Sequence, residues 1–293
     1  MSGRRKEASA ALLPLYQRTT KNGFKIQIID ALLSALDPIL ENQRLIDMAS
    51  EGARLAGELG ATDVRAHFMS RRADFLMAKI SSYHYQCANL KLAPGWIEFS
   101  TEVDRNNYEI LARKKNELEI EIEQLLNEAL ALAERTGNKK VLAFILMSRA
   151  SVQSSRYIQY KMDSMRSTWK AKIWLLLHRM GYEVPILFGF KYSRVLKSYV
   201  SSFTGDYRRA AKLFEEIDDD GAGYAYFDLA VNLKSSYHFR KAKKSLRKAE
   251  NIAKKYNNEL MAAKIKDLAK SIKARNRDVP DYLKGEKREE IVV

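Results

Sequence analysis

Apolar residues recur along the chain at helical rather than strand spacing. One series comprises Ile26, Ile29, Leu32, Leu33 and Leu36, and another comprises Leu125, Ala129, Leu132 and Ala133. Steps of three and four residues place such side chains on one face of a helix. The stretch 118–122 alternates with a period of two, but strong helix formers flank it, so we predict that it lies within one long helix starting near Asp104. The pattern therefore predicts an all-α protein.

The chain also resembles itself at a fixed offset. A shift of 77 residues aligns Leu55 with Leu132, Ala56 with Ala133, Gly60 with Gly137, Val64 with Val141, Ala66 with Ala143, Arg72 with Arg149 and Ala73 with Ala150. A further shift of 120 aligns Leu132 with Ile252, Ala133 with Ala253, Gly137 with Asn257, Val141 with Met261, Ala143 with Ala263 and Ile145 with Ile265. Gly and Asn are the residues that most readily take the left-handed conformation ending a helix. We therefore expect the same turn in all three copies.

Weaker copies of this turn are expected at Gly181 and Gly221, with one further turn near 94–96. The resulting unit of about 36 to 44 residues is one helix hairpin, which must stack on its neighbours to bury its apolar faces. The sequence thus predicts a right-handed α-solenoid of about six antiparallel hairpins. We expect one domain over residues 21–277 with an irregular segment near 90–105, a flexible basic segment at 1–20 and a mobile tail at 278–293.

Composition supports helices and gives little sign of catalysis. Gly (13) and Pro (5) are too few among 293 residues for a turn-rich β protein. The single Cys, Cys87, permits no intramolecular disulfide and favours a reducing compartment, so we expect a cytoplasmic protein. The most apolar stretch, 173–188, is interrupted by charged residues and too short to span a membrane, so core helices are favoured over membrane insertion.

The region from residue 205 onward resembles the tetratricopeptide repeat (TPR) family. Gly205, Asp206, Tyr207, Ala210 and Phe214 look like the hairpin turn and second helix of such a repeat, and Tyr226 to Ala249 keep the family's small and large positions. The family's Trp and closing Pro are absent. The resemblance is good over residues 120–275 and extends to 45–80. It implies a protein or peptide binder that uses a concave groove formed by the first helix of each pair.

The repeat register nominates residues for that groove. They are Arg72, Arg149, Lys191, Arg194, Tyr224, Phe227 and Lys234. The alternative for each is an ordinary packing or solvated residue.

Motifs of catalysis and metal binding are weak or missing. The sequence has no phosphate loop, dinucleotide fingerprint, H-E-x-x-H or G-x-S-x-G motif. His84 and Cys87 lie three residues apart, but two ligands do not make a zinc site. The acids of 216–221 resemble a calcium loop, yet its twelfth position is Phe227 instead of Glu, so we interpret them as a solvated helix end and loop. We therefore predict no enzymatic activity, no metal and no cofactor.

The formal charge of +15 is concentrated near the C-terminal end. Between Lys234 and Arg288 there are 18 Lys and Arg residues against six acids, a net charge of +12, and the other residues together carry +3. Four of the lysines line one predicted helix face, opposite Ala242, Leu246 and Ala249; they are Lys241, Lys244, Lys248 and Lys255. Such a stripe can bind acidic proteins or phosphate backbones, and it can equally act as a solubilising cap.

These observations favour a non-enzymatic scaffold or sensor that binds an acidic protein or peptide partner. The alternatives are a nucleic-acid-binding α-solenoid acting through the basic C-terminal hairpins, and a regulatory subunit of a larger assembly. Lys outnumbers Arg in the stripe, and no aromatic stacking module accompanies it, which favours the protein partner.

Overall fold

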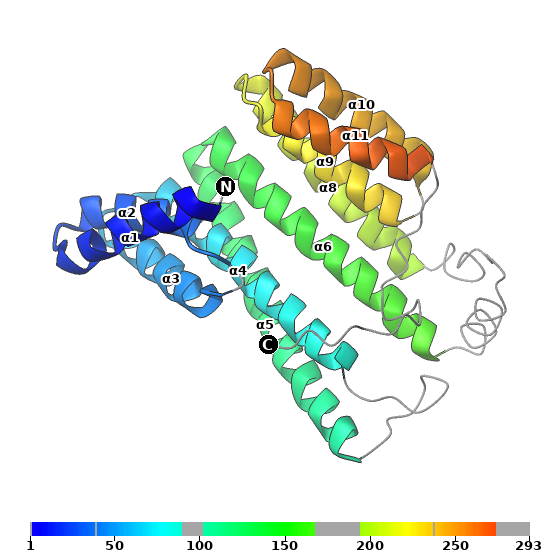
Figure 1. The fold of residues 1–293 in the computed structure, drawn as a ribbon, viewed down its shortest axis with the longest axis horizontal. Coiled ribbons are helices and arrows are strands. Elements are labelled where there is room, and N and C mark those ends of the chain that lie inside the picture. Colours follow the sequence, from blue (N-terminus) through cyan, green and yellow to red (C-terminus); the bar gives the residue numbers. More distant parts are fainter. Residues whose placement is uncertain (1, 39, 90–101, 168–193, 237, 274–293) are drawn as a thin grey trace. The chain divides into compact units, whose positions relative to one another are not determined.

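The computed structural model describes residues 2–38, 40–89, 102–167, 194–236 and 238–273, which form ten α-helices without a strand (Figure 1). The helices are α1 (Ser2–Arg18), α2 (Asn22–Ala35), α3 (Asn42–Glu58), α4 (Thr62–Asn89), α5 (Glu102–Thr136), α6 (Lys139–Ser167), α8 (Arg194–Glu216), α9 (Gly221–Ser235), α10 (Phe239–Lys255) and α11 (Glu259–Lys273). Neighbouring helices pack consecutively, so the prediction of an all-α helical-repeat solenoid is confirmed. The stretch 118–122 lies inside α5, as predicted.

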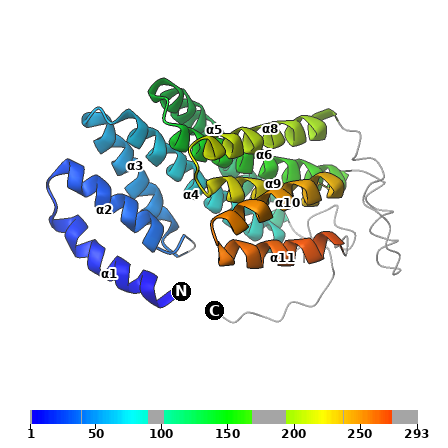
Figure 2. The same ribbon diagram turned by 90° about the horizontal axis from the view of Figure 1, so that it is seen from above.

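The chain divides into two compact units, residues 1–217 and 218–293, where the sequence predicted one repeat domain. In the first unit α1 to α6 pack in succession, α4 also contacts α6, and α8 lies along α6 (Figure 2). In the second unit α9, α10 and α11 all contact one another. The division falls at a turn near Asp218, whose backbone is left-handed (φ 53°).

The expected repeat turn is present at all three strong positions. Gly60 (φ 69°), Gly137 (φ 68°) and Asn257 (φ 50°) each have left-handed backbone between two helices. The chain reverses identically at the first and third of these, because the amides of Ala61 and Asn258 donate to the carbonyls of Ala56 and Ala253, each at 2.9 Å. The repeat inferred from sequence is therefore a repeat of backbone geometry.

Of the weaker turn predictions, the one at Gly221 was misplaced, and so was the hairpin turn that the TPR resemblance implied at Gly205. Gly221 begins α9, and the left-handed residue is Asp218 three positions earlier. Gly205 lies within the continuous helix α8, so no hairpin turn exists there. A glycine permits a turn but does not impose one, and the apolar face of α8 keeps this segment helical. The predicted turns at Gly181 and near 94–96, and the tail at 278–293, lie outside the described residues.

Close packing places glycine at two helix contacts. At Gly52 of α3 a Cβ atom would stand 2.7 Å from the ring of Phe68 in α4. At Gly223 of α9 it would stand 2.7 Å from the sulfur of Met261 and 3.0 Å from Cγ2 of Ile252. The backbones approach closely at both points because no side chain intervenes.

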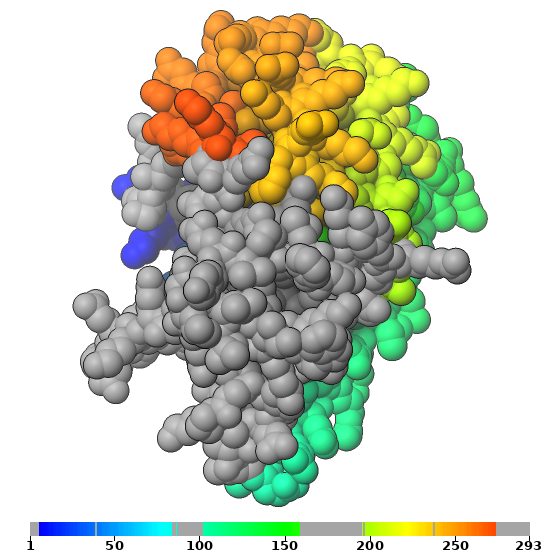
Figure 3. All heavy atoms as spheres, turned by 90° about the vertical axis from the view of Figure 1, so that its right-hand side faces the viewer, coloured from blue at the N-terminus to red at the C-terminus, as the bar shows by residue number. Residues whose placement is uncertain are grey.

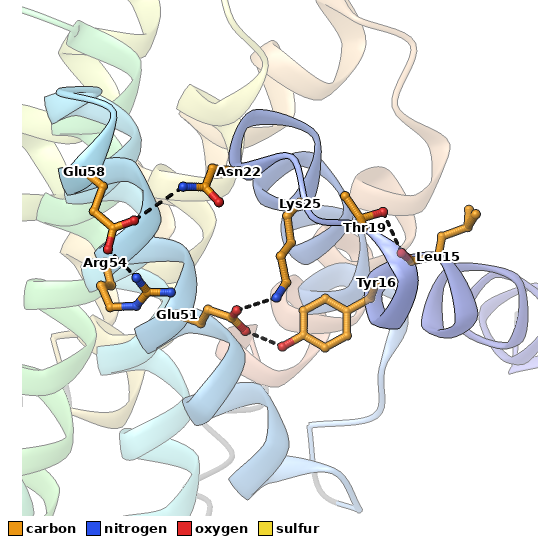
Figure 4. A network of polar contacts seen from close by, with 8 residues as sticks. All are labelled: Leu15, Tyr16, Thr19, Asn22, Lys25, Glu51, Arg54 and Glu58. Carbon is orange, nitrogen blue, oxygen red and sulfur yellow. Dashed lines mark hydrogen bonds and ion pairs between the residues drawn. The ribbon is translucent and has the colours of Figure 1, made fainter.

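The segment predicted to be flexible, 1–20, instead contains helix α1. Its Tyr16 hydroxyl donates to Glu51 of α3, and Lys25 Nζ of α2 lies 2.8 Å from the other oxygen of that carboxylate (Figure 4). The same ammonium lies 4.9 Å from the centre of the Tyr16 ring. Burial, together with the Glu51 contact, raises the pKa of Tyr16 to about 12. Contacts with α2 and α3, which the sequence pattern of α1 alone did not reveal, hold this helix.

Candidate functional site

Two of the predicted groove residues are engaged in contacts between helices. Arg72 of α4 pairs with Glu121 of α5, and its Nε is buried without a hydrogen-bond partner in the described part of the chain. Arg149 of α6 donates two hydrogen bonds of 2.7 Å to the carboxylate of Asp206 in α8. These side chains join neighbouring helices and do not present free charges to a ligand.

The pair between Arg149 and Asp206 is the best-defined ion pair of the first unit. The Asp206 side chain is 12% exposed and that of Arg149 is 28% exposed, and both guanidinium contacts are short. The hydrogen bond from Arg149 to Asp206 holds the pKa of the guanidinium above its ordinary value, although partial burial opposes this. The parallel, two-point geometry is the strongest form of an ion pair in proteins.

The remaining groove candidates lie in the second unit or outside the described side chains. Tyr224 and Phe227 are half-buried on α9, and the Tyr224 hydroxyl accepts a 3.2 Å hydrogen bond from Asn258. Lys234 is 8% exposed, so it is a buried residue. Lys191 lies outside the described residues, and Arg194 begins α8 with its side chain outside them. Among the three described side chains in this group, none is an exposed cation.

The basic stripe, in contrast, lies on the exposed face of α10. Lys241, Lys244, Lys248 and Lys255 are all exposed, while Ala242, Leu246 and Ala249 on the opposite face are buried. In the space-filling view the side chains of α10 and α11 lie at the molecular surface, in orange to red (Figure 3). The helix carries eight basic residues and one acid among 17 positions.

Two members of the stripe have partners inside the second unit. Lys248 donates a 3.1 Å hydrogen bond to the Tyr226 hydroxyl and lies 4.6 Å from the centre of that ring. Lys255 pairs with Asp218, which also accepts a 2.7 Å hydrogen bond from the Tyr256 hydroxyl. The hydrogen bond from Lys255, and then that from Tyr256, lowers the pKa of the Asp218 carboxyl. These contacts join α10 to α9 and to the turn before α9, and they reduce the charge available for a ligand.

Three further cations complete the free part of this face, and the sequence analysis missed them. Arg240, Lys243 and Arg247 are exposed and, like Lys241 and Lys244, have no ion pair among the described residues. Their spacing of three and four residues was the available signal. We call Arg240, Lys241, Lys243, Lys244 and Arg247 the basic face of α10.

The acids of the calcium-like sequence serve the turn before α9. Glu216 pairs with Lys139 at 3.0 Å, Asp218 with Lys255, and the Asp219 carboxylate accepts a 2.8 Å hydrogen bond from the Gly221 amide. Over the described ranges, no three His, Cys, Asp or Glu side chains are grouped to hold a metal. The side chains of His84 and Cys87, both in α4, lie outside the described set. No described helix has the length and apolarity needed to cross a membrane.

Comparisons with known proteins add little to this geometry. No protein-family model matches the chain, and no curated protein matches it. Among solved structures, the crystal structure of BtubC (BKLC) from P. vanneervenii covers 88% of this chain and 91% of its own. The two share 13% sequence identity, and the TM-score is 0.33.

Proposed function

We propose that this protein is a TPR-like, non-enzymatic scaffold of the cytoplasm that binds an acidic protein or peptide segment on the basic face of α10. The observation that carries the proposal is the row of five exposed cations on one helix without ion-pair partners among the described residues. The basic face extends about 11 Å along the helix at 1.5 Å per residue, which matches an extended segment of about four residues.

The charge row has an energetic consequence for the isolated protein. Like charges three or four residues apart on a helix repel by about 0.2–0.5 kcal/mol per pair. An acidic ligand removes this repulsion and gains attraction, which falls off beyond about 8 Å at physiological salt. The face is therefore better suited to binding a complementary charge than to stabilising its own helix.

An acidic protein is favoured over nucleic acid by the side chains around these cations. The exposed arc of α10 contains Asn251 and basic residues and no aromatic side chain on which a base could stack. Three of the five free cations are lysines, which act as point charges and lack the planar fork that recognises phosphate at two points.

A charge-reversal experiment tests the proposal. Full-length protein is titrated into a fluorescent peptide of alternating Glu and Gly, and separately into single-stranded and duplex DNA, at 50 and 300 mM salt. We expect K241E/K244E/R247E to weaken peptide binding at least tenfold. The matched control R113E/K114E/R208E changes the same charge at exposed residues of α5 and α8 without described partners, and should change binding less than twofold.

Two outcomes would contradict the proposal. Equal losses in both triple variants would show that only the overall charge attracts the peptide. Tighter binding of DNA than of peptide at 150 mM salt, lost in K241E/K244E/R247E, would assign the same face to nucleic acid, whose affinity falls steeply with salt.

A further inference from the structure

An open groove runs between α10 and α11, and no member of the basic face is among its lining residues. Its floor contains the buried residues Ala253 and Ile265, and the exposed residues Ala262 and Ala269 line it. Charged residues also line it. Lys254 and Glu259 lie at the facing ends of the two helices, Lys266 lies between Ala262 and Ala269 along α11, and Lys254 Nζ lies 2.8 Å from the Glu250 carboxylate. Small apolar side chains among these charges leave room for another helix to pack against the hairpin.

The first unit contains a hairpin of the same form, α5/α6, which the repeat offset of 120 residues relates to α10/α11. Asn138 accepts a 3.2 Å hydrogen bond from the Val141 amide, and Asn258 accepts a 3.0 Å bond from the Met261 amide. With the left-handed residues Gly137 and Asn257 before them, the two hairpins have the same turn and the same helix cap. Each residue of the α10/α11 groove therefore has a defined counterpart in α5 and α6.

The counterpart groove in the first unit is filled by helix α8. Arg209 of α8 lies 3.1 Å from Glu134, and Glu216 of α8 lies 3.0 Å from Lys139. Glu134 and Lys139 are the counterparts of Lys254 and Glu259.

The third contact of α8 joins its Asp206 to Arg149 of α6, and Arg149 is the counterpart of Ala269. On α6, Leu142 and Leu146 are buried, whereas their counterparts Ala262 and Lys266 on α11 are exposed. Among the described residues of the second unit, the α10/α11 hairpin thus lacks the third helix that covers its counterpart.

We propose that the α10/α11 groove binds an amphipathic helix from a partner protein, lying on α11 as α8 lies on α6. The charges at the two ends of this groove are reversed relative to the first unit, because Lys254 replaces Glu134 and Glu259 replaces Lys139. The bound helix carries an acid facing Lys254 and a base seven residues later facing Glu259. Where α8 has Asp206 it carries an apolar residue, since Ala269 replaces Arg149 and offers no charge.

The sequence disfavours two other occupants. A second copy's α8 would bring Arg209 against Lys254 and Glu216 against Glu259, so both contacts would be repulsive. Residues 274–293 lack the apolar spacing of Phe203, Tyr207, Ala210 and Phe214 in α8, because positions 284–290 contain no apolar residue. A separate partner helix satisfies both the apolar floor and the reversed charges.

The test uses two labelled peptides with the sequence of residues 194–216 and full-length protein. Both carry D206L, and the second also carries R209E and E216K, so the two have the same net charge and differ only in where two charges lie. We expect the second peptide to bind about 5- to 30-fold more tightly, because the two repulsions of the first peptide become two exposed ion pairs in the second. In the variant K254E/E259K, which restores the charges of Glu134 and Lys139, the preference should reverse.

Bulky substitutions locate the binding surface. A269W fills the groove and should weaken binding of the preferred peptide at least tenfold, whereas A263W, exposed on the same helix but outside the groove, should change it less than twofold. The variant K241E/K244E/R247E should keep the same preference between the peptides, since none of these three residues lines the groove. Failure of this proposal is thereby distinguished from failure of the proposed function.

Five results would overturn the proposal. Three of them are absence of binding by either peptide, an unchanged preference in K254E/E259K, and equal effects of A269W and A263W. The other two concern other occupants of the groove. A dimer abolished by A269W would assign the groove to a second copy, and peptide binding at least fivefold tighter in I291D/V292D/V293D would assign it to the chain's own terminal residues.

Discussion

The hairpins α5/α6 and α10/α11 share a backbone turn but present different surfaces. Both reverse at a left-handed residue, Gly137 or Asn257, and both are capped by an asparagine. On the first hairpin the face of α6 is leucine-rich and covered by α8. The corresponding face of α11 carries Ala and Lys and is exposed. Turn and cap residues therefore determine how a hairpin folds, and the residues of its outer face determine what covers it.

The largest expected effect concerns the ion pair that attaches α8 to α6. Arg149→Ala leaves the largely buried Asp206 carboxylate unpaired, and we expect a loss of about 2–3 kcal/mol in unfolding free energy, below the range for fully buried pairs because Arg149 is partly exposed. Urea denaturation followed by circular dichroism measures this loss. The exposed variant Lys212→Ala is the control and should stay within about 0.5 kcal/mol. A loss as small as the control's would mean that α8 is held by apolar packing alone.

The second prediction concerns a carboxyl group of the second unit. Burial raises the pKa of Asp228 to about 6, although Lys264 partly opposes this. In the unfolded state the carboxyl has a pKa of about 3.9. Between pH 4 and 6 the folded state therefore keeps a proton that the unfolded state has released. Stability falls as pH rises through this window. We expect Asp228→Asn to stabilise the protein by about 1–3 kcal/mol at pH 8 and to leave it nearly unchanged at pH 4. Thermal melts across this range test the prediction, and a constant difference between the two proteins at all pH values would refute it.

The third prediction compares the two turns directly. Gly137→Ala forces a Cβ into left-handed backbone and should cost about 1 kcal/mol, with no steric clash because nothing lies within 4 Å of the added atom. Asn257→Gly should change stability by only a few tenths of a kcal/mol, since asparagine already tolerates this conformation. Denaturation midpoints of both variants show the difference. Equal losses of stability in the two variants would mean that the left-handed backbone does not determine the cost of these substitutions.

The smallest effect is expected on the basic face of α10. K241A/K244A/R247A removes exposed cations without described partners, so the unfolding free energy should change by less than about 0.5 kcal/mol. A melting curve measures it. A loss above about 1.5 kcal/mol would show that these side chains support the fold, and would remove the main reason for assigning them to a ligand.

Sequence reasoning succeeded where a local rule fixes the structure. The turns at Gly60, Gly137 and Asn257 follow from the left-handed preference of these residues, and the burial of Ala242, Leu246 and Ala249 follows from helical spacing. It failed where the outcome depends on a distant partner. Neither the pairing of Arg149 with Asp206 nor the burial of Lys234 can be obtained from spacing, because both depend on which helix packs opposite. The same holds for α1, whose docking depends on Glu51 of α3.

The close approach at Gly223 bears on how freely this unit can vary. A methyl group there would stand 2.7 Å from the Met261 sulfur and 3.0 Å from Cγ2 of Ile252, so these side chains must shift to admit it. Exposed positions such as Ala262 and Ala269 carry no such restriction. In a library of all single substitutions, we expect the second unit to accept changes along the outer surface of α11 more readily than changes at residue 223. The outer surface of α11 can therefore vary more freely than the contact between α9 and its neighbours.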